Sequence, residues 1–132
     1  MYLENSKTII VKIGSSLIID NKKVIRKEWL LDFAKDIKNL RKKNKNVIIV
    51  SSGAIALGCK KLKIIKKKLK IDQSQAVASI GQIELMNLFK EVFAIQKINI
   101  SQILLTLEDT EKRRRAINCL LYTSDAADDT CC

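Results

Sequence analysis

The sequence contains no histidine and no proline, and only four of its 132 residues are glycine. Without histidine, Ser-His-Asp and Cys-His nucleophilic sites are excluded. Aromatic residues make up 5%, and none lies inside the lysine-rich runs, so there is no evident stacking surface for single-stranded nucleic acid. No apolar run is as long as a membrane span, and the N-terminus does not resemble a signal peptide. We therefore expect a cytoplasmic protein that does not enter a membrane.

Cysteine is present, but three of the four cysteines fall within residues 119–132. Lysine and arginine stop at Arg115, and the segment that follows resembles an in-frame translation of sequencing-adaptor DNA. We expect 119–132 to be a non-native tail that is not part of the natural fold. A genuine acidic C-terminus is the alternative. Cys59 is then the one cysteine left, which agrees with a reducing compartment. With no CxxC pair and no histidine, no metal site is predicted.

The net charge of +11 comes mostly from lysine. Such an excess suits a nucleic-acid-binding module or an anionic membrane surface. It equally suits a solvated surface in a protein rich in Lys, Ile and Asn, because the basic residues are scattered over several segments. Apolar residues make up 47%, so the chain can build a core, and its length suits one domain at most.

The hydrophobic pattern predicts a layered α/β fold. Continuous apolar runs at 8–13 and 47–50 are typical of strands that are buried on both faces. Between them, 26–43 has apolar residues at helical spacing, which makes a parallel βαβ unit. Further expected elements are a short strand extension at 17–19, a helix at 53–61, a long helix at 72–96 capped by Asp72, a third strand at 99–106 and a helix from Glu108.

Both of the first two strands run directly into glycine-serine turns. The first delivers Lys12, Gly14 and Ser15, and the second delivers Ser52 and Gly53. In open α/β sheets, ligands bind beyond the carboxyl ends of the strands, so these turns predict a phosphate-binding seat. The alternatives are plain tight turns, serines that act as helix N-caps, and a lysine that simply reaches water from a strand end.

The run 53–60, GAIALGCK, nearly matches the Walker A phosphate loop. However, Cys59 separates glycine from lysine, and Lys61 stands where Ser or Thr should bind magnesium. Its interior, Ala-Ile-Ala-Leu, favours a helix over an open loop. We therefore reject a P-loop, and there is no GxGxxG dinucleotide motif either.

Four blocks in order resemble the glutamate 5-kinase family of the amino acid kinase superfamily. They are VKIGSS at 11–16, VSSGAIALG at 50–58, ASIGQ at 78–82 and QILLT at 102–106. The likeness covers about 8–118 and implies a three-layer αβα sandwich with a mainly parallel sheet. Gly14 is followed by serine, whereas aspartate and acetylglutamate kinases usually carry a second glycine there, which favours this branch.

The resemblance also implies an activity, namely ATP-dependent phosphorylation of the side-chain carboxylate of L-glutamate as the first step of proline synthesis. Lys12, with Gly14 and Ser15, would contact the ATP phosphates, and Lys12 would be the catalytic residue. Ser52 and Gly53 would bind glutamate. Magnesium would accompany ATP, held by parts of the family domain that have no counterpart here. Intact members of the family tend to be homo-oligomers.

The departure from the family is one of length, because the family domain is roughly twice as long, within the usual domain range. We expect 1–118 to be the N-terminal part of such a domain, truncated and by itself inactive and poorly stable. Two alternatives remain open from the sequence: another small-molecule kinase of the same superfamily, and a basic nucleic-acid-binding module.

Overall fold

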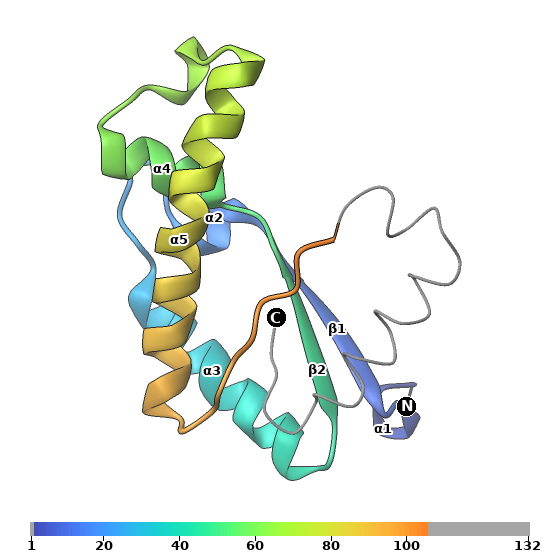
Figure 1. The fold of residues 1–132 in the computed structure, drawn as a ribbon. Coiled ribbons are helices and arrows are strands. Elements are labelled where there is room, and N and C mark those ends of the chain that lie inside the picture. The colour runs from blue at the N-terminus through green and yellow to red at the C-terminus, as the bar shows by residue number, and fades with distance from the viewer. Residues whose placement is uncertain (1, 106–132) are drawn as a thin grey trace.

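The computed structural model describes residues 2–105 and contains two strands and several helices (Figure 1). In chain order the elements are α1 (Tyr2–Asn5), β1 (Thr8–Ile13), α2 (Ser15–Ile18), α3 (Lys27–Lys42), β2 (Asn46–Ser51), α4 (Ala54–Leu62), the 3₁₀ helix η1 (Lys66–Lys68) and α5 (Ile71–Ile95). The helix expected from Glu108 and the tail 119–132 lie outside the described residues. Within them, no helix is long and apolar enough to cross a bilayer.

The strands β1 and β2 pair in parallel, with Ile9 opposite Val47 and Ile13 opposite Ser51. Parallel neighbours need a crossover connection, and α3 provides it. The predicted strand–helix–strand unit is therefore confirmed. Its two strands end at the same edge of the sheet, so the turns that follow them start side by side.

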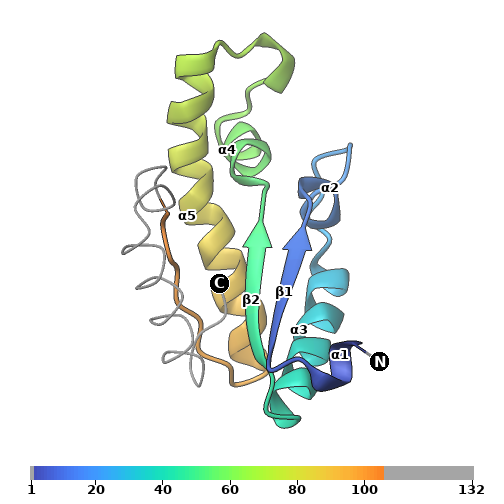
Figure 2. The same ribbon diagram turned by 90° about the vertical axis from the view of Figure 1, so that its right-hand side faces the viewer.

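One face of the sheet is covered by helices, which Figures 1 and 2 show on the same side of β1 and β2. The side chains of Ile13, Val47 and Ile49 are buried on this face, together with Leu30 of α3 and Val92 of α5. Burying this much aliphatic surface is the main stabilising term for the fold, since each fully buried large apolar side chain contributes about 1.5–3 kcal/mol.

The other face of the sheet is open in the described part of the chain. Ile10 is 67% exposed and Val50 is 51% exposed, and Lys12, opposite Val50 in the register, is exposed as well. The prediction that both strands are buried on both faces is therefore wrong for residues 2–105. The apolar composition of the runs indicates a covered sheet, but within these residues the covering layer exists on one side alone.

The helices follow the sequence pattern closely, with two local corrections. Residues 17–19 do not extend β1, because Leu17 and Ile18 belong to the short helix α2 and Ile19 forms an isolated bridge with Ile25. The long helix α5 begins one residue before Asp72, so Asp72 lies in its first turn rather than at its cap. The side chain of Gln73 accepts a hydrogen bond from the backbone N–H of Lys70 there, at 3.0 Å.

The predicted third strand is wrong for residues 99–105, which form neither strand nor helix. In Figure 2 this segment lies on the far side of β2 from β1. Ile98 and Ile100 pack against the core, and Ile103 is half-buried, while the other residues from 99 to 105 are exposed. The segment therefore contacts the core at some positions, but the ladder of hydrogen bonds that defines a strand is not formed within residues 99–105.

Candidate phosphate-binding site at the carboxyl edge of the sheet

Lys12 occupies the next-to-last position of β1, and its side chain is exposed. Side chains alternate along a strand, so Lys12 shares the open face of the sheet with Ile10. No acidic side chain within residues 2–105 forms a salt bridge with it. The ammonium group is thus available at the end of the strand, one residue before the first turn begins.

The two glycine-serine turns lie against each other. The backbone N–H of Ser52 donates a hydrogen bond to the carbonyl oxygen of Ile13 at 3.1 Å, which ties the end of β2 to the end of β1. A Cβ placed on Gly53 would lie 3.7 Å from the Cα of Ser15, so the second turn contacts the start of α2. The structure therefore brings four of the five predicted site residues, Gly14, Ser15, Ser52 and Gly53, to one place, with Lys12 on the adjoining strand.

The two turn glycines exist for different reasons. Gly53 has φ of +136°, which L side chains rarely adopt, and an added Cβ would lie 3.2 Å from Cδ1 of Ile18. Gly14 has φ of −75°, which any residue can adopt, and an added Cβ would meet no atom within 4 Å. Neither backbone geometry nor packing within the described chain requires glycine at position 14. A ligand that approaches the backbone closely would be a reason for glycine at position 14.

The serines of the turns are not helix caps. The N-cap residues of α2 and α4 are Gly14 and Gly53, which have no side chain that could form a capping hydrogen bond. Ser15 stands inside α2, and Ser52 precedes the cap of α4. The Oγ of Ser51 donates to the carbonyl oxygen of Ser52 at 3.3 Å, and the Ser52 residue itself is exposed.

The N-terminus of α4 adds backbone donors to the same place. The first intrahelical hydrogen bond runs from the N–H of Leu57 to the carbonyl oxygen of Gly53, at 2.9 Å. The N–H groups of residues 54–56 come before it and have no intrahelical acceptor, and the helix dipole makes this end favourable for an anion. The cluster therefore combines a cation, hydroxyl groups and a helix N-terminus, which is a suitable set for binding phosphate or carboxylate oxygens.

The rejection of a Walker A loop is confirmed. Residues 54–60 of that run lie in the helix α4, and the second glycine of the run, Gly58, is buried. That glycine contacts α5: an added Cβ would overlap the carbonyl oxygen of Val77. The spacing that imitates a phosphate loop is thus explained by helix packing.

The sequence did not indicate that Gly81 contacts the first residue of α4, next to the candidate site. Gly81 of α5 is buried against the first residue of α4, Ala54, whose carbonyl oxygen an added Cβ would overlap. The only sequence signal was a glycine in the middle of a long helical run, where glycine costs about 1 kcal/mol relative to alanine. Such a residue usually has a packing or functional reason.

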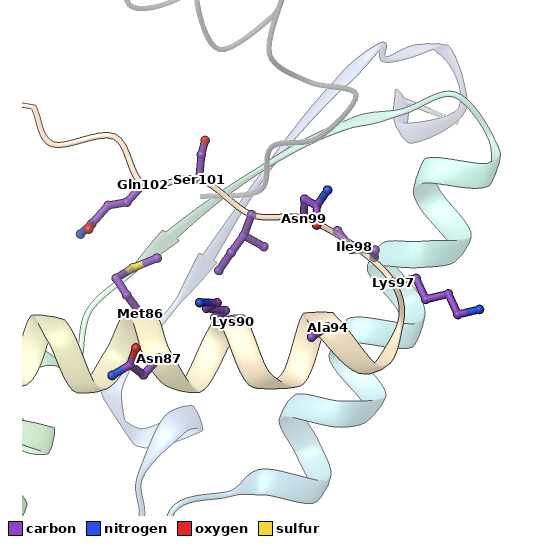
Figure 3. Close-up of a pocket in the computed structure, with 10 residues that line it drawn as sticks. Met86, Asn87, Lys90, Ala94, Lys97, Ile98, Asn99, Ser101 and Gln102 are labelled. Atoms are coloured by element: carbon purple, nitrogen blue, oxygen red, sulfur yellow. The ribbon is translucent and has the colours of Figure 1, made fainter.

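A pocket of about 600 Å³ lies elsewhere, between the second half of α5 and residues 97–102 (Figure 3). Met86, Asn87 and Lys90 line it from the helix, and Lys97 points away from it. None of the predicted site residues lines this pocket.

The described residues also contain no group of three His, Cys, Asp or Glu side chains that could hold a metal ion, so this part of the chain does not fit a magnesium site.

Comparison with known proteins shows the family of the chain. The amino acid kinase family matches residues 7–127. A protein named glutamate 5-kinase from Pelagibacter ubique (strain HTCC1062) is 75% identical over 118 residues, which is 89% of this chain and 32% of that protein. Glutamate 5-kinases from Ruegeria sp. (strain TM1040) and Bartonella henselae (strain ATCC 49882 / DSM 28221 / CCUG 30454 / Houston 1) are 45% and 46% identical over 88% of the chain, covering 32% and 31% of their own lengths. The chain thus spans about a third of the curated relatives it matches. From the family match and the paired turns we conclude that this chain belongs to the amino acid kinase family.

Proposed function

We propose that the whole protein phosphorylates the side-chain carboxylate of L-glutamate with ATP, giving L-glutamyl 5-phosphate for proline synthesis. The observation that carries the proposal is the 75% identity over 118 residues to a protein named glutamate 5-kinase. The two adjacent turns at the carboxyl edge of the sheet support it, because they offer one seat for a phosphate and one for a carboxylate. Residues 1–118 would be the N-terminal part of the kinase domain, and 119–132 a non-native tail.

The first turn would receive the ATP phosphates. Lys12 is exposed near the end of β1 and carries a positive charge, and an added Cβ at Gly14 would meet no atom within 4 Å, so a ligand could approach the backbone there. Ser15 adds a hydroxyl donor. A fixed ammonium group stabilises the charge on the transferring phosphoryl group without any covalent step by the enzyme.

The second turn would receive glutamate. Ser52 is exposed and directly precedes Gly53, the N-cap residue of α4, so a hydroxyl group and the helix N-terminus are neighbours in the chain. In the reaction, a carboxylate oxygen of glutamate attacks the γ-phosphorus of ATP, and the bond to the bridging oxygen breaks, so ADP leaves. Holding the two substrates in line is most of the catalytic task, and it requires no histidine and no nucleophile from the chain.

Magnesium belongs to the proposal as the usual partner of ATP phosphates. We place its ligands outside residues 2–105, since these contain no suitable cluster. The enzyme is proposed to be a cytoplasmic homo-oligomer that binds neither membrane nor nucleic acid.

A substrate panel on the purified full-length protein tests the proposal. Acyl phosphate is trapped with hydroxylamine while ADP is measured, with L-glutamate, L-aspartate, N-acetyl-L-glutamate and carbamate as acceptors. We expect turnover with L-glutamate well above the others. Turnover with another acceptor and none with glutamate would assign a different kinase of the family. Binding of RNA or DNA with steep salt dependence and no kinase activity would favour the basic nucleic-acid module.

A further inference from the structure

The helices α4 and α5 are in backbone contact at two glycines. Gly58 of α4 lies on Val77 of α5, and Gly81 of α5 lies on Ala54 of α4; both glycines are buried. An added Cβ on Gly58 would lie 2.8 Å from Cγ1 of Val77 and would overlap its carbonyl oxygen. Figure 1 shows α4 beside the first half of α5.

The contact at Gly81 cannot be relieved by a change of rotamer. An added Cβ there would overlap the carbonyl oxygen of Ala54 and would lie 2.6 Å from both its carbonyl carbon and the backbone nitrogen of Gly58. All three atoms belong to the main chain of α4. A methyl group at position 81 must therefore push the first turn of α4 away from α5, because packed interiors have no spare space to absorb it.

The first turn of α4 is continuous with the candidate site. Ala54 directly follows Gly53, whose carbonyl oxygen accepts the hydrogen bond from Leu57, and Ser52 is bonded through its N–H to Ile13. A displacement of Ala54 is therefore passed to the second turn within two residues. Gly81 itself does not line the turn, so its influence would act entirely through α4.

We propose that Gly81 is a positioning residue for the acceptor site: by having no side chain, it lets α5 hold the N-terminus of α4 where the Ser52–Gly53 turn meets the substrate carboxylate. This inference rests on the proposed function and gives a structural role to one residue of the ASIGQ block at 78–82. The close glycine contact at Gly58 holds the same helix pair one turn further along α4.

The test compares Gly81→Ala with Val92→Ala in the full-length enzyme. Val92 is fully buried in the second half of the same helix, so its truncation destabilises the fold by a cavity away from the Gly81 contact with Ala54. In Gly81→Ala we expect the KM for glutamate to rise about tenfold, with a smaller change in the KM for ATP, since small misplacement at a reacting site is costly. In Val92→Ala both KM values stay at the parent level.

A merely structural role predicts a different result, in which Gly81→Ala loses active enzyme but the remaining enzyme keeps both KM values. That outcome overturns the proposal. If Gly81→Ala does not fold, Val77→Ala takes its place: it loosens the same helix contact without overlap, and a rise of about threefold in the glutamate KM is expected. An unchanged KM in Val77→Ala would then refute the positioning role.

Amide hydrogen exchange separates this inference from the proposed function. Gly81→Ala or Val77→Ala should accelerate exchange at the N–H groups of Ser52 and Leu57 more than Val92→Ala does, whatever the acceptor substrate is. If the parent does not phosphorylate glutamate, the proposed function fails and this exchange pattern alone decides the positioning role. Equal exchange in all variants contradicts it.

Discussion

The Gly14→Ala substitution separates a glycine kept for a ligand from a glycine kept for the fold. At φ of −75° and ψ of 156°, alanine is allowed at this position, and its methyl group meets no atom within 4 Å. Restricting the unfolded chain stabilises by about 0.4–1 kcal/mol. Alanine is a poorer N-cap than glycine, which offsets part of this gain. The net change in the free energy of unfolding should therefore lie within about 1 kcal/mol of zero.

The same substitution at Gly53 should behave in the opposite way. Its φ of +136° is strained for alanine, and the new methyl group would press on Ile18 at 3.2 Å. Holding a non-glycine residue in such a conformation costs about 1–3 kcal/mol. Urea unfolding of the full-length protein, monitored by circular dichroism, measures both values, and Gly53→Ala serves as the contrast for Gly14→Ala.

Activity should fall in Gly14→Ala although stability does not. If the methyl group displaces one charge-assisted hydrogen bond to an ATP phosphate, about 1.5–3 kcal/mol of binding is lost. The KM for ATP should then rise by about ten- to a hundredfold. The assay is initial-rate ADP formation at saturating glutamate. Parent-like kinetics in a Gly14→Ala enzyme of parent-like stability would refute the idea that ATP phosphates approach the backbone at position 14.

Four further outcomes are expected. Lys12→Ala should lower kcat by about 10²–10³-fold with an unchanged melting temperature, because an exposed charge that stabilises the transferring phosphoryl group is lost. Lys68→Ala on η1 is the control, and equal kcat values in the two variants would contradict the role of Lys12. Ser52→Ala should raise the KM for glutamate about tenfold through loss of a hydrogen bond, while Ser79→Ala, on the surface of α5, leaves it unchanged; the opposite ranking would exclude Ser52 from the acceptor site. Ile10→Ser should change the free energy of unfolding of the 132-residue chain by less than about 0.5 kcal/mol. In the full-length protein the same substitution should cost about 1.5–3 kcal/mol if the open face of the sheet is covered there. Equal costs in the two proteins would show that the face is not covered. The 132-residue chain alone should form no glutamyl phosphate in the hydroxylamine assay, since it spans about a third of its relatives, and detectable product would contradict this.

Local pattern was sufficient for most of the secondary structure. The strand at 8–13 coincides with β1, and the helix expected at 26–43 differs from α3 by one residue at each end. Both follow from side-chain periodicity, which is a property of neighbouring residues. The expected strand at 99–106 failed at 99–105 because a strand needs a hydrogen-bonded neighbour, which periodicity does not report.

The residue types also indicated the candidate site, since Lys12 lies near the end of the first of two parallel strands and the other predicted residues, Gly14, Ser15, Ser52 and Gly53, follow the strand ends. It could not tell the two turn glycines apart, because φ and the surrounding space are properties of the folded chain. In the fold, Gly53 is needed for its backbone and Gly14 is not.

The amino-acid order alone settled the parallel βαβ unit, the helical nature of the Walker-like run and the likeness to a family, because these depend on spacing along the chain. Packing settled the rest: which face of the sheet is covered, and that Gly81 of one helix supports Ala54 of another. A hydrophobic residue in the sequence indicates that its burial is favourable, but it does not indicate which part of the chain covers it. A contact between two backbones becomes visible once the helices are docked, because it depends on distance in space rather than on the residue types that lie near each other in sequence.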